Sequence, residues 1–221
     1  MTSPPSSEDY QFFQQNRPYD WFESIYARAN GNGNSVPWAQ LEPRPDVVQW
    51  LNRRQVDGGR QTALVIGCGL GDDAEELVRR GFEVTAFDIS PTAIKWCRER
   101  FPNSTVRYQV VDLFAPPHDW SGHFDFVLEY FTIQSLPPYM HTKTIEAVAR
   151  LVAPRGTILV ICTGRPVNAN IGGGPPWPMP KETLDTFKAC GLTEVDFEEY
   201  DHRQDSLVRK FRIEYRAKGD E

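Results

Sequence analysis

Residues 63–90, ALVIGCGLGDDAEELVRRGFEVTAFDIS, decide the fold of this chain. The apolar run at residues 63–66 predicts a buried parallel strand, and a tight glycine turn follows at residues 67–71. The pattern of residues 72–80 predicts an amphipathic helix, and residues 83–87 predict a second strand. Such a strand–helix–strand unit is typical of folds that bind nucleotide-like ligands outside the carboxyl ends of their strands.

The glycine turn and Asp88 together predict a ligand site. Gly67 and Gly69 lack a β-carbon, which lets backbone amides approach a ligand closely. Asp88 follows the turn by about twenty residues, where a carboxylate can accept hydrogen bonds from a ribose diol. A glycine-rich turn by itself also fits plain strand–helix packing. The position of Asp88 at the end of the second predicted strand favours the ligand site.

Two carboxylates at the start of the predicted helix narrow the class of ligand. A dinucleotide-binding turn carries its third glycine at the position held here by Asp72, and Asp73 adds a second negative charge. A helix start that binds a phosphate offers bare amides. Two carboxylates would repel a pyrophosphate, whereas they tolerate a ligand with an amino acid group and a sulfonium. We therefore expect S-adenosylmethionine as cofactor and S-adenosylhomocysteine as its product.

Composition and charge argue against several classes of protein. The 221 residues carry a net charge of −6, which does not fit a general nucleic-acid binder. The four cysteines are far apart in the sequence and predict buried thiols, with no metal site. No run reaches the length of a membrane span, and the first residues lack a signal pattern. We expect a cytoplasmic protein, monomeric or weakly dimeric, that acts on a small molecule without a membrane or nucleic-acid partner.

The aromatic first quarter of the chain is predicted to form a lid. Residues 1–9 are polar and rich in Pro and Ser, which predicts disorder. Residues 10–55 carry many aromatic side chains, among them Trp21 and Trp38, but are too few for a domain core of their own. We expect this helical segment to lie over the carboxyl ends of the strands; the alternative is packing on the back of the sheet. Residues 56–221 then form the main domain.

Beyond Asp88 the alternation of strands and helices continues. Helices are predicted at residues 90–101, 139–151 and 181–190, strands at 105–110, 124–130 and 157–162, and two closing strands at 192–200 and 207–216. The closing strands are joined by a short polar turn, so the last strand is predicted to be antiparallel to the others. The sum is a seven-stranded Rossmann-like α/β sheet with helices on both faces.

Several short motifs occur along the chain in a characteristic order. They are Val36-Pro37-Trp38, Gly67-Cys68-Gly69-Leu70-Gly71-Asp72-Asp73, Phe87-Asp88-Ile89-Ser90, Phe124-Asp125-Phe126-Val127, Leu136-Pro137-Pro138 and Gly173-Gly174-Pro175-Pro176. With the five strand–helix units and the closing hairpin, they resemble the class I S-adenosylmethionine-dependent methyltransferases. Within that class the chain is similar to the thiopurine methyltransferase and halide/thiol methyltransferase family, over roughly residues 21–192. The Val-Pro-Trp segment and the Gly-Gly-Pro-Pro loop are the more specific motifs.

The resemblance implies roles for the residues at matched positions. It implies cofactor contacts for Trp38, Gly67, Gly69, Asp88, Ile89, Asp112 and Leu113 and a substrate contact for Trp21. We also expect Cys68 and Glu129 to contact the cofactor, and Tyr130 and His141 to contact the substrate. Asp88 would bind the ribose and Asp112 the adenine amine. Two positions depart from the family pattern: Ile66 replaces a proline, and His141 replaces an arginine that often follows the Leu-Pro-Pro turn. The second departure leaves the acceptor open.

The acceptor class depends on whether a base is needed. A methyl group on a sulfonium is already activated, so a thiol or another soft nucleophile needs positioning and exclusion of water. An oxygen or nitrogen acceptor benefits from a base, and His141 is the best-placed histidine; its alternative is a solvated residue at a helix start. Glu129 at the end of the fourth predicted strand can bind the cofactor's amino group, or serve as a structural polar contact.

We therefore expect methyl transfer to a small thiol or other soft acceptor by in-line displacement. One rival is an O- or N-methyltransferase of a small aromatic metabolite. A nicotinamide-dependent oxidoreductase is a rival from another class, and Asp72 and the closing hairpin count against it. The third is an S-adenosylmethionine-binding protein without catalysis, which the aromatic lid makes less favourable.

Overall fold

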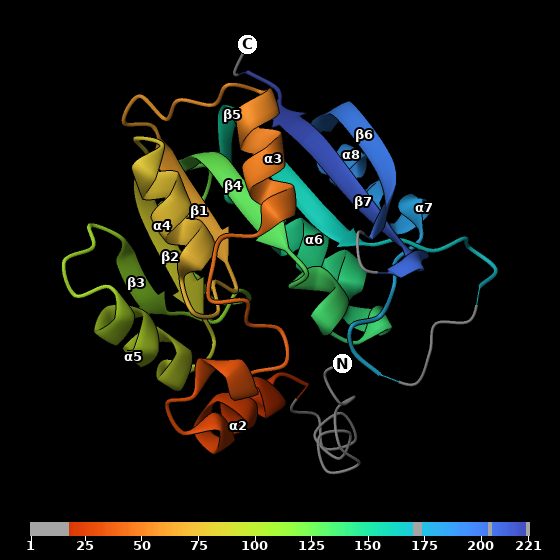
Figure 1. The fold of residues 1–221 in the computed structure, drawn as a ribbon. Coiled ribbons are helices and arrows are strands. Elements are labelled where there is room, and N and C mark those ends of the chain that lie inside the picture. Colours follow the sequence, from red (N-terminus) through yellow and green to blue (C-terminus); the bar gives the residue numbers. More distant parts are fainter. Residues whose placement is uncertain (1–17, 170–173, 203–204, 220–221) are drawn as a thin grey trace. The chain divides into compact units, whose positions relative to one another are not determined.

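The computed structural model describes residues 18–169, 174–202 and 205–219 (Figure 1). Its strands form a seven-stranded sheet with the order β3-β2-β1-β4-β5-β7-β6. The chain divides into two compact units, Met1–Asp112 and Leu113–Glu221. The predicted boundary between residues 55 and 56 stays a prediction.

The first unit contains the predicted strand–helix–strand arrangement around the glycine turn. Strands β1 (Thr62–Ile66), β2 (Glu83–Asp88) and β3 (Arg107–Val110) are parallel, and helices α4 (Asp72–Arg79) and α5 (Pro91–Arg100) connect them. Residues 63–66 are all buried because this strand is covered on both faces. The predicted elements are confirmed here to within a residue or two, and Asp88 is the last residue of β2.

Among the described residues, two α-helices and a short 3₁₀ helix of the first unit precede β1. Helix α2 (Asp20–Ala29) packs against α5, and η1 (Gly33–Ser35) and α3 (Pro45–Arg53) follow. Pro45 begins α3, where a fixed φ and a missing N–H suit the first turn. Helix α2 ends at Asn30 in the left-handed conformation (φ 45°), which asparagine tolerates better than most residues. The predicted residues 10–17 of this segment lie outside the described residues.

The second unit carries the other four strands, β4 (Phe124–Tyr130), β5 (Val152–Thr163), β6 (Leu192–His202) and β7 (Asp205–Ala217). The short helices before and after β4 are η2 (His118–Trp120), η3 (Ile133–Ser135) and η4 (Pro138–Met140), followed by α6 (His141–Ala149), α7 (Lys181–Leu184) and α8 (Thr186–Ala189). Strand β7 is antiparallel to both β5 and β6. The predicted antiparallel last strand is therefore confirmed.

Two predicted boundaries in this unit are wrong. The sequence predicts the fifth strand at residues 157–162, but β5 begins at Val152 and its register against β4 shifts between Phe124 and Phe126. An irregularity in the ladder accommodates Pro154, which has no N–H to donate. The predicted helix at residues 181–190 is divided into α7 and α8 at Asp185. Within the described residues, no helix is long and apolar enough to cross a membrane.

Candidate cofactor site in the first unit

Asp88 is tied to the glycine turn that follows β1. Its Oδ2 accepts a hydrogen bond from the backbone N–H of Gly69 (3.0 Å), and its Oδ1 accepts one from the backbone N–H of Ser90 (2.9 Å). The Cys68 N–H donates to the carbonyl of Phe87 (2.8 Å), which holds the turn against the end of β2. The predicted proximity of Asp88 and the turn is thus a set of direct contacts.

The backbone of the turn requires glycine. Gly67, Gly69 and Gly71 have φ values of 57°, 56° and 90°, a region that side chains with a β-carbon rarely adopt. A β-carbon on Gly71 would lie 2.5 Å from Tyr108 Oη, and one on Gly69 would lie 3.3 Å from Tyr26 Oη. Gly71 is therefore needed for packing inside the unit, whereas Gly67 is exposed and leaves its backbone accessible.

The Asp88 carboxyl is buried, with 6% of its surface exposed. Its pKa is raised to about 6, mainly by burial and also by the negative charge of Glu23. The backbone hydrogen bonds from Ser90 and Gly69 act in the opposite direction. Above pH 6 the group is a carboxylate, each of whose oxygens can accept more than one hydrogen bond. Asp88 can therefore receive donors from a ligand in addition to those of the chain.

The carboxylates of Asp72 and Asp73 are engaged inside the protein. Asp72 forms a two-pronged ion pair with Arg100 of α5 (2.8 and 2.7 Å). Asp73 accepts a hydrogen bond from the backbone N–H of Arg44 (2.7 Å). Burial raises the pKa of Asp73 to about 6. The prediction that both act by repelling a pyrophosphate is wrong for Asp72, because Arg100 neutralises its charge. The two carboxylates instead connect the start of α4 to α5 and to the segment before α3.

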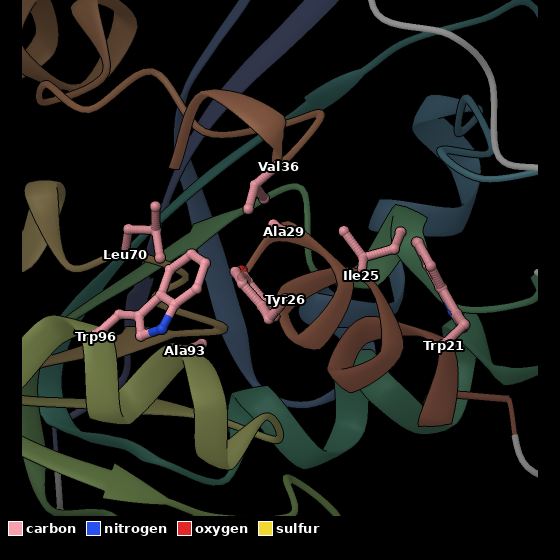
Figure 2. Close-up of a cluster of buried hydrophobic side chains, with 8 residues drawn as sticks. All are labelled: Trp21, Ile25, Tyr26, Ala29, Val36, Leu70, Ala93 and Trp96. Atoms are coloured by element: carbon pink, nitrogen blue, oxygen red, sulfur yellow. The ribbon is translucent and has the colours of Figure 1, made fainter. Parts of the chain in front are cut away.

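The aromatic residues predicted to form a lid are packed in one cluster with the turn and α5. The cluster contains Trp21, Ile25, Tyr26, Ala29, Val36, Leu70, Ala93 and Trp96 (Figure 2). Figure 2 shows Tyr26 of α2 beside Trp96 of α5, and their ring centroids are 6.2 Å apart. Trp38 packs against the cluster, and its Nε1–H donates to Tyr26 Oη (2.8 Å). The segment is thus held to the first unit by a hydrophobic core.

Glu23 of α2 is a functional candidate that the sequence reasoning missed. Its carboxylate accepts hydrogen bonds from Ser90 Oγ (2.5 Å), Thr92 Oγ1 (2.5 Å) and the backbone N–H of Thr92 (3.2 Å). Burial raises the pKa of Glu23, but these hydrogen bonds outweigh burial and leave the pKa below its usual value. In the sequence, Ser90-Pro91 indicates the start of a helix. It does not indicate that Glu23, 67 residues earlier, binds to this helix start.

Three further predicted contacts are Ile89, directly after β2, and Asp112 and Leu113, at which the first unit ends and the second begins. Ile89 follows Asp88 and is half-buried, and Asp112 is half-buried as well. Leu113 belongs to the second unit and is 7% exposed. The N–H of Val111 donates to the carbonyl of Asp88 (3.1 Å), which links the chain before Asp112 to the end of β2. The predicted contacts of these residues with an adenine stay predictions.

Cys68 in the glycine turn has a second cysteine as its neighbour. The Cys97 thiol donates to the carbonyl of Gly69 (3.2 Å). A hydrogen bond with Cys97, together with burial, raises the pKa of Cys68 well above its usual range. Cys68 is therefore a neutral thiol that packs in the turn, and its predicted contact with the cofactor stays a prediction. Among the residues that the structure describes, no group of three His, Cys, Asp or Glu side chains is arranged to hold a metal.

In the second unit, Glu129 is the next-to-last residue of β4, and its carboxyl is buried. Its Oε1 accepts the backbone N–H of Ile133 (2.9 Å), while its Oε2 is buried and has no partner among the described residues. Burial raises the pKa of Glu129 to about 7, against the backbone hydrogen bonds from Ile133 and Thr132. A buried oxygen with no partner is costly, which marks this side chain as a candidate for a ligand contact. The next residue, Tyr130, accepts a hydrogen bond at its Oη from Lys210 Nζ (3.1 Å).

His141 is the first residue of α6, and 5% of its surface is exposed. Its Nε2 lies 2.9 Å from the carbonyl oxygen of Leu136. A carbonyl only accepts, so the ring proton is on Nε2 and Nδ1 has the lone pair. Burial lowers the pKa of His141 and the charge of Arg165 lowers it further, although the bond to Leu136 acts in the opposite direction. The alternative of a solvated histidine is wrong, and its role as a base stays a prediction.

The comparisons with known proteins agree with this geometry. A family profile described as "Methyltransferase domain" matches residues 63–156, which include the glycine turn and Asp88. The ubiquinone biosynthesis O-methyltransferase of Xanthomonas campestris pv. campestris (strain B100) is 30% identical over 169 residues, covering 75% of this chain and 67% of that enzyme. The chain belongs to the class I S-adenosylmethionine-dependent methyltransferases.

Other members of this methyltransferase family are similar over different lengths. The ubiquinone biosynthesis O-methyltransferase of Xanthomonas oryzae pv. oryzae (strain PXO99A) is 31% identical over 139 residues, and this chain spans 56% of its length. The 1,6-didemethyltoxoflavin-N1-methyltransferase of Burkholderia thailandensis, solved with S-adenosylhomocysteine, has the same fold: the TM-score is 0.69, with 16% identity over 99% of this chain and 93% of that one. The predicted α/β methyltransferase fold is confirmed, and membership of this family counts against a nicotinamide-dependent oxidoreductase.

The first unit of this methyltransferase fits the family's cofactor on two observations. Asp88 is a buried carboxylate that holds the glycine turn and retains acceptor capacity for a ribose diol. Gly67 is exposed with a positive φ, so a ligand can approach its backbone without meeting a β-carbon. Neither observation depends on Asp72 or Asp73, to which the sequence argument had assigned the selection of cofactor.

Proposed function

We propose that this protein transfers a methyl group from S-adenosylmethionine to a small-molecule acceptor. The observation that carries the proposal is the buried Asp88 carboxylate at the end of β2, bonded to the Gly69 N–H of the glycine turn. The fold, the turn and the family agree with it. The bound cofactor supplies a methyl group that its sulfonium has already activated for displacement.

The residues of the first unit would bind and orient the cofactor. Asp88 would accept hydrogen bonds from the ribose hydroxyls, and the exposed backbone of Gly67 and the turn would hold the amino acid part. Trp38 and Trp21 belong to the packed aromatic segment, which would exclude water from the reacting atoms. Such exclusion favours the transfer, because a nucleophile is more reactive without its hydration shell.

We infer that an oxygen acceptor is the better supported of the two acceptor classes. The two curated relatives described above are O-methyltransferases of ubiquinone biosynthesis. A hydroxyl acceptor must lose a proton as the methyl group arrives, and a base with a pKa near the working pH is suited to this. The pKa of Glu129, about 7, lies in that range. Glu129 is therefore a candidate for the base as well as for the predicted contact with the cofactor's amino group.

A thiol acceptor is the second candidate, and it rests on the resemblance to the thiopurine methyltransferase family. The motifs that support it are Val36-Pro37-Trp38 and Leu136-Pro137-Pro138; the first glycine of the Gly-Gly-Pro-Pro loop lies outside the described residues. A neutral His141 can accept a proton through Nδ1 and raise the thiolate fraction of such a substrate.

Two experiments in sequence test the proposal. Calorimetry should detect binding of S-adenosylhomocysteine and no binding of NAD. A screen with methyl-labelled S-adenosylmethionine should then find transfer to a phenol or catechol, with thiols, halides and amines tested in parallel. Binding of NAD without a response to S-adenosylhomocysteine contradicts the proposed function. Transfer to thiols alone would select the second acceptor class.

A further inference from the structure

Glu23 occupies the N-terminus of α5, the helix that follows the ribose-binding strand. Its two carboxylate oxygens receive three donors from Ser90 and Thr92, at 2.5, 2.5 and 3.2 Å. The first turn of a helix has unpaired N–H groups and a partial positive charge. A ligand anion often occupies such a place, whereas here a side chain from α2 does so.

Ser90 connects Glu23 to the proposed cofactor site. Its hydroxyl donates to Glu23 Oε2 and accepts the N–H of Ala93 (3.0 Å), which caps α5. Its backbone N–H donates to Asp88 Oδ1 (2.9 Å), and Asp88 Oδ2 in turn accepts the N–H of Gly69. Four residues from separate elements therefore form one continuous chain of hydrogen bonds: Glu23, Ser90, Asp88 and Gly69.

A second residue of α2 lies close to the same turn. The Tyr26 hydroxyl lies 3.3 Å from the place of a β-carbon on Gly69. It accepts a hydrogen bond from the indole of Trp38. Helix α2 thus approaches the glycine turn with one residue and the start of α5 with another. Displacement of α2 would have to break the bonds of Glu23 with Ser90 and Thr92.

We propose that Glu23 is a positioning residue for cofactor binding, which holds α2 against α5 and, through Ser90, orients the carboxylate of Asp88. The proposal rests on the proposed function, because it assigns the Asp88 carboxylate to the cofactor. Glu23 contacts neither Asp88, the residue predicted to bind the ribose, nor any reacting group. It acts through Ser90. Nothing in its sequence neighbourhood, which is aromatic, marks it for this role.

The electrostatics of the site supply a readout that packing alone would not change. Glu23 raises the pKa of Asp88 by its negative charge. Within the described part of the chain, two further ionisable groups interact with Asp88, Tyr26 from α2 and Cys68 from the turn, and the pKa values of both are raised well above their usual values. Those two groups are uncharged between pH 5 and 8, so the charge of Glu23 is the one whose removal changes the titration of Asp88.

The test compares Glu23→Ala, Glu23→Gln and Ser90→Ala by calorimetry with S-adenosylhomocysteine. We expect Glu23→Ala to raise Kd about 10-fold at pH 7.5, the lower end of the range for losing a hydrogen bond to a charged group. Ser90→Ala should have a similar effect. The double variant should bind about as weakly as either single variant, because both changes break the same chain. Glu42→Gln, an exposed acid of the same segment, is the control and should bind as the unaltered protein does.

The pH profile separates positioning from folding. In the unaltered protein, Kd should rise as the pH falls below about 6, because protonated Asp88 loses acceptor capacity. In Glu23→Gln this rise should begin at a lower pH, because the charge that raises the Asp88 pKa is gone. Circular dichroism checks that each variant is folded.

Each outcome has a defined meaning. If the unaltered protein does not bind S-adenosylhomocysteine, the proposed function fails and this inference fails with it. If the unaltered protein binds, but folded Glu23→Ala and Glu23→Gln show the same Kd and the same pH profile, the positioning role alone is overturned. Additive losses in the double variant would likewise contradict a shared chain through Ser90.

Discussion

The backbone N–H of Gly69 donates a hydrogen bond to Asp88 Oδ2 at 3.0 Å, so the glycine turn after β1 and the end of β2 are joined by the acid assigned to the ribose. This contact makes Asp88 both a part of the turn and a candidate ligand contact. It also explains why the carboxyl tolerates burial: its oxygens receive backbone donors before any ligand is present.

Asp88→Ala should weaken the binding of S-adenosylhomocysteine by about 1.5–3 kcal/mol, the range for losing a charged acceptor. The Gly69 and Ser90 N–H groups lose their partner as well, so a small loss of stability should accompany the change. Calorimetry and thermal unfolding measure the two effects. Exposed Asp119 supplies the control, Asp119→Ala. Equal affinity of the Asp88 variant and the unaltered protein would refute the ribose assignment.

Gly69→Ala should impair cofactor binding more than a matched glycine change elsewhere. Gly69 has φ 56° and a neighbour 3.3 Å from the place of its β-carbon, whereas Gly59 has φ 51° and nothing within 4 Å. Both alanine variants should lose about 1–2 kcal/mol of stability from backbone strain. The Gly69 variant alone should bind S-adenosylhomocysteine more weakly. If the two variants bind S-adenosylhomocysteine with similar affinity, the glycine turn is not part of the cofactor site.

Glu129→Gln should stabilise the free protein at alkaline pH. The pKa of Glu129 is raised by burial to about 7, so its contribution to stability is fully present below its unfolded-state pKa and is lost as pH rises through 7. A glutamine keeps the acceptor for Ile133 without a buried charge. We expect a gain of about 1–3 kcal/mol at pH 8 that vanishes near pH 5, measured by urea unfolding. The exposed Glu146→Gln is the control.

The same variant tests whether Glu129 serves a ligand. If its unpartnered Oε2 receives the amino group of the cofactor, Glu129→Gln should bind S-adenosylhomocysteine more weakly while being more stable. Such a trade between stability and function is common at functional sites. Improved stability with unchanged affinity would make Glu129 a structural contact for the turn after β4.

Binding of S-adenosylhomocysteine should protect the segment between α2 and η1 from proteolysis. Arg28 is exposed near the end of α2, and Gly31 follows with φ 83°. Trypsin cleavage there requires local opening of the segment. A ligand bound at the glycine turn, whose Leu70 belongs to the aromatic cluster, should reduce that opening. Gel analysis over time measures the rate. An unchanged rate at saturating ligand would place the segment away from the cofactor.

His141→Ala should lower stability by about 1–3 kcal/mol, because the buried carbonyl of Leu136 loses its donor. Where His141 also acts as a base, the variant should slow methylation of a thiol more at pH 7 than at pH 9, since the thiol ionises by itself at high pH. His141→Asn, which can still donate to the carbonyl, should restore stability more than activity. If the methylation rates of both variants change only as their stability changes, His141 is a structural residue.

The sequence by itself determined the unit on which the fold is built. The apolar run before the turn, the three glycines of the turn and the acid about twenty residues on are local signals, because each depends on strand burial, backbone freedom or spacing. These signals predicted β1, α4 and β2 and the proximity of Asp88 to the turn. The closing hairpin was predicted for the same reason: a short polar link between two strands forces an antiparallel pair.

The partners of the charged side chains were decided by the tertiary structure. Asp72 and Asp73 look alike in the sequence, yet one pairs with Arg100 and the other accepts the N–H of Arg44. Glu23 was overlooked because its partners Ser90 and Thr92 are almost seventy residues away. Hydropathy patterns assign residues to faces and ends of elements, but they carry no information about which distant donor meets a given carboxylate.

The burial of His141 and Glu129 was also decided by packing. Both occupy positions at the end of one element or the start of another, where the sequence alone allows either a solvated or a buried side chain. Packing of the surrounding segments left His141 with 5% of its surface exposed and Glu129 with none. Their pKa values follow from that burial, because removing a charge from water favours the neutral form, and burial is a property of the assembled chain rather than of its local sequence.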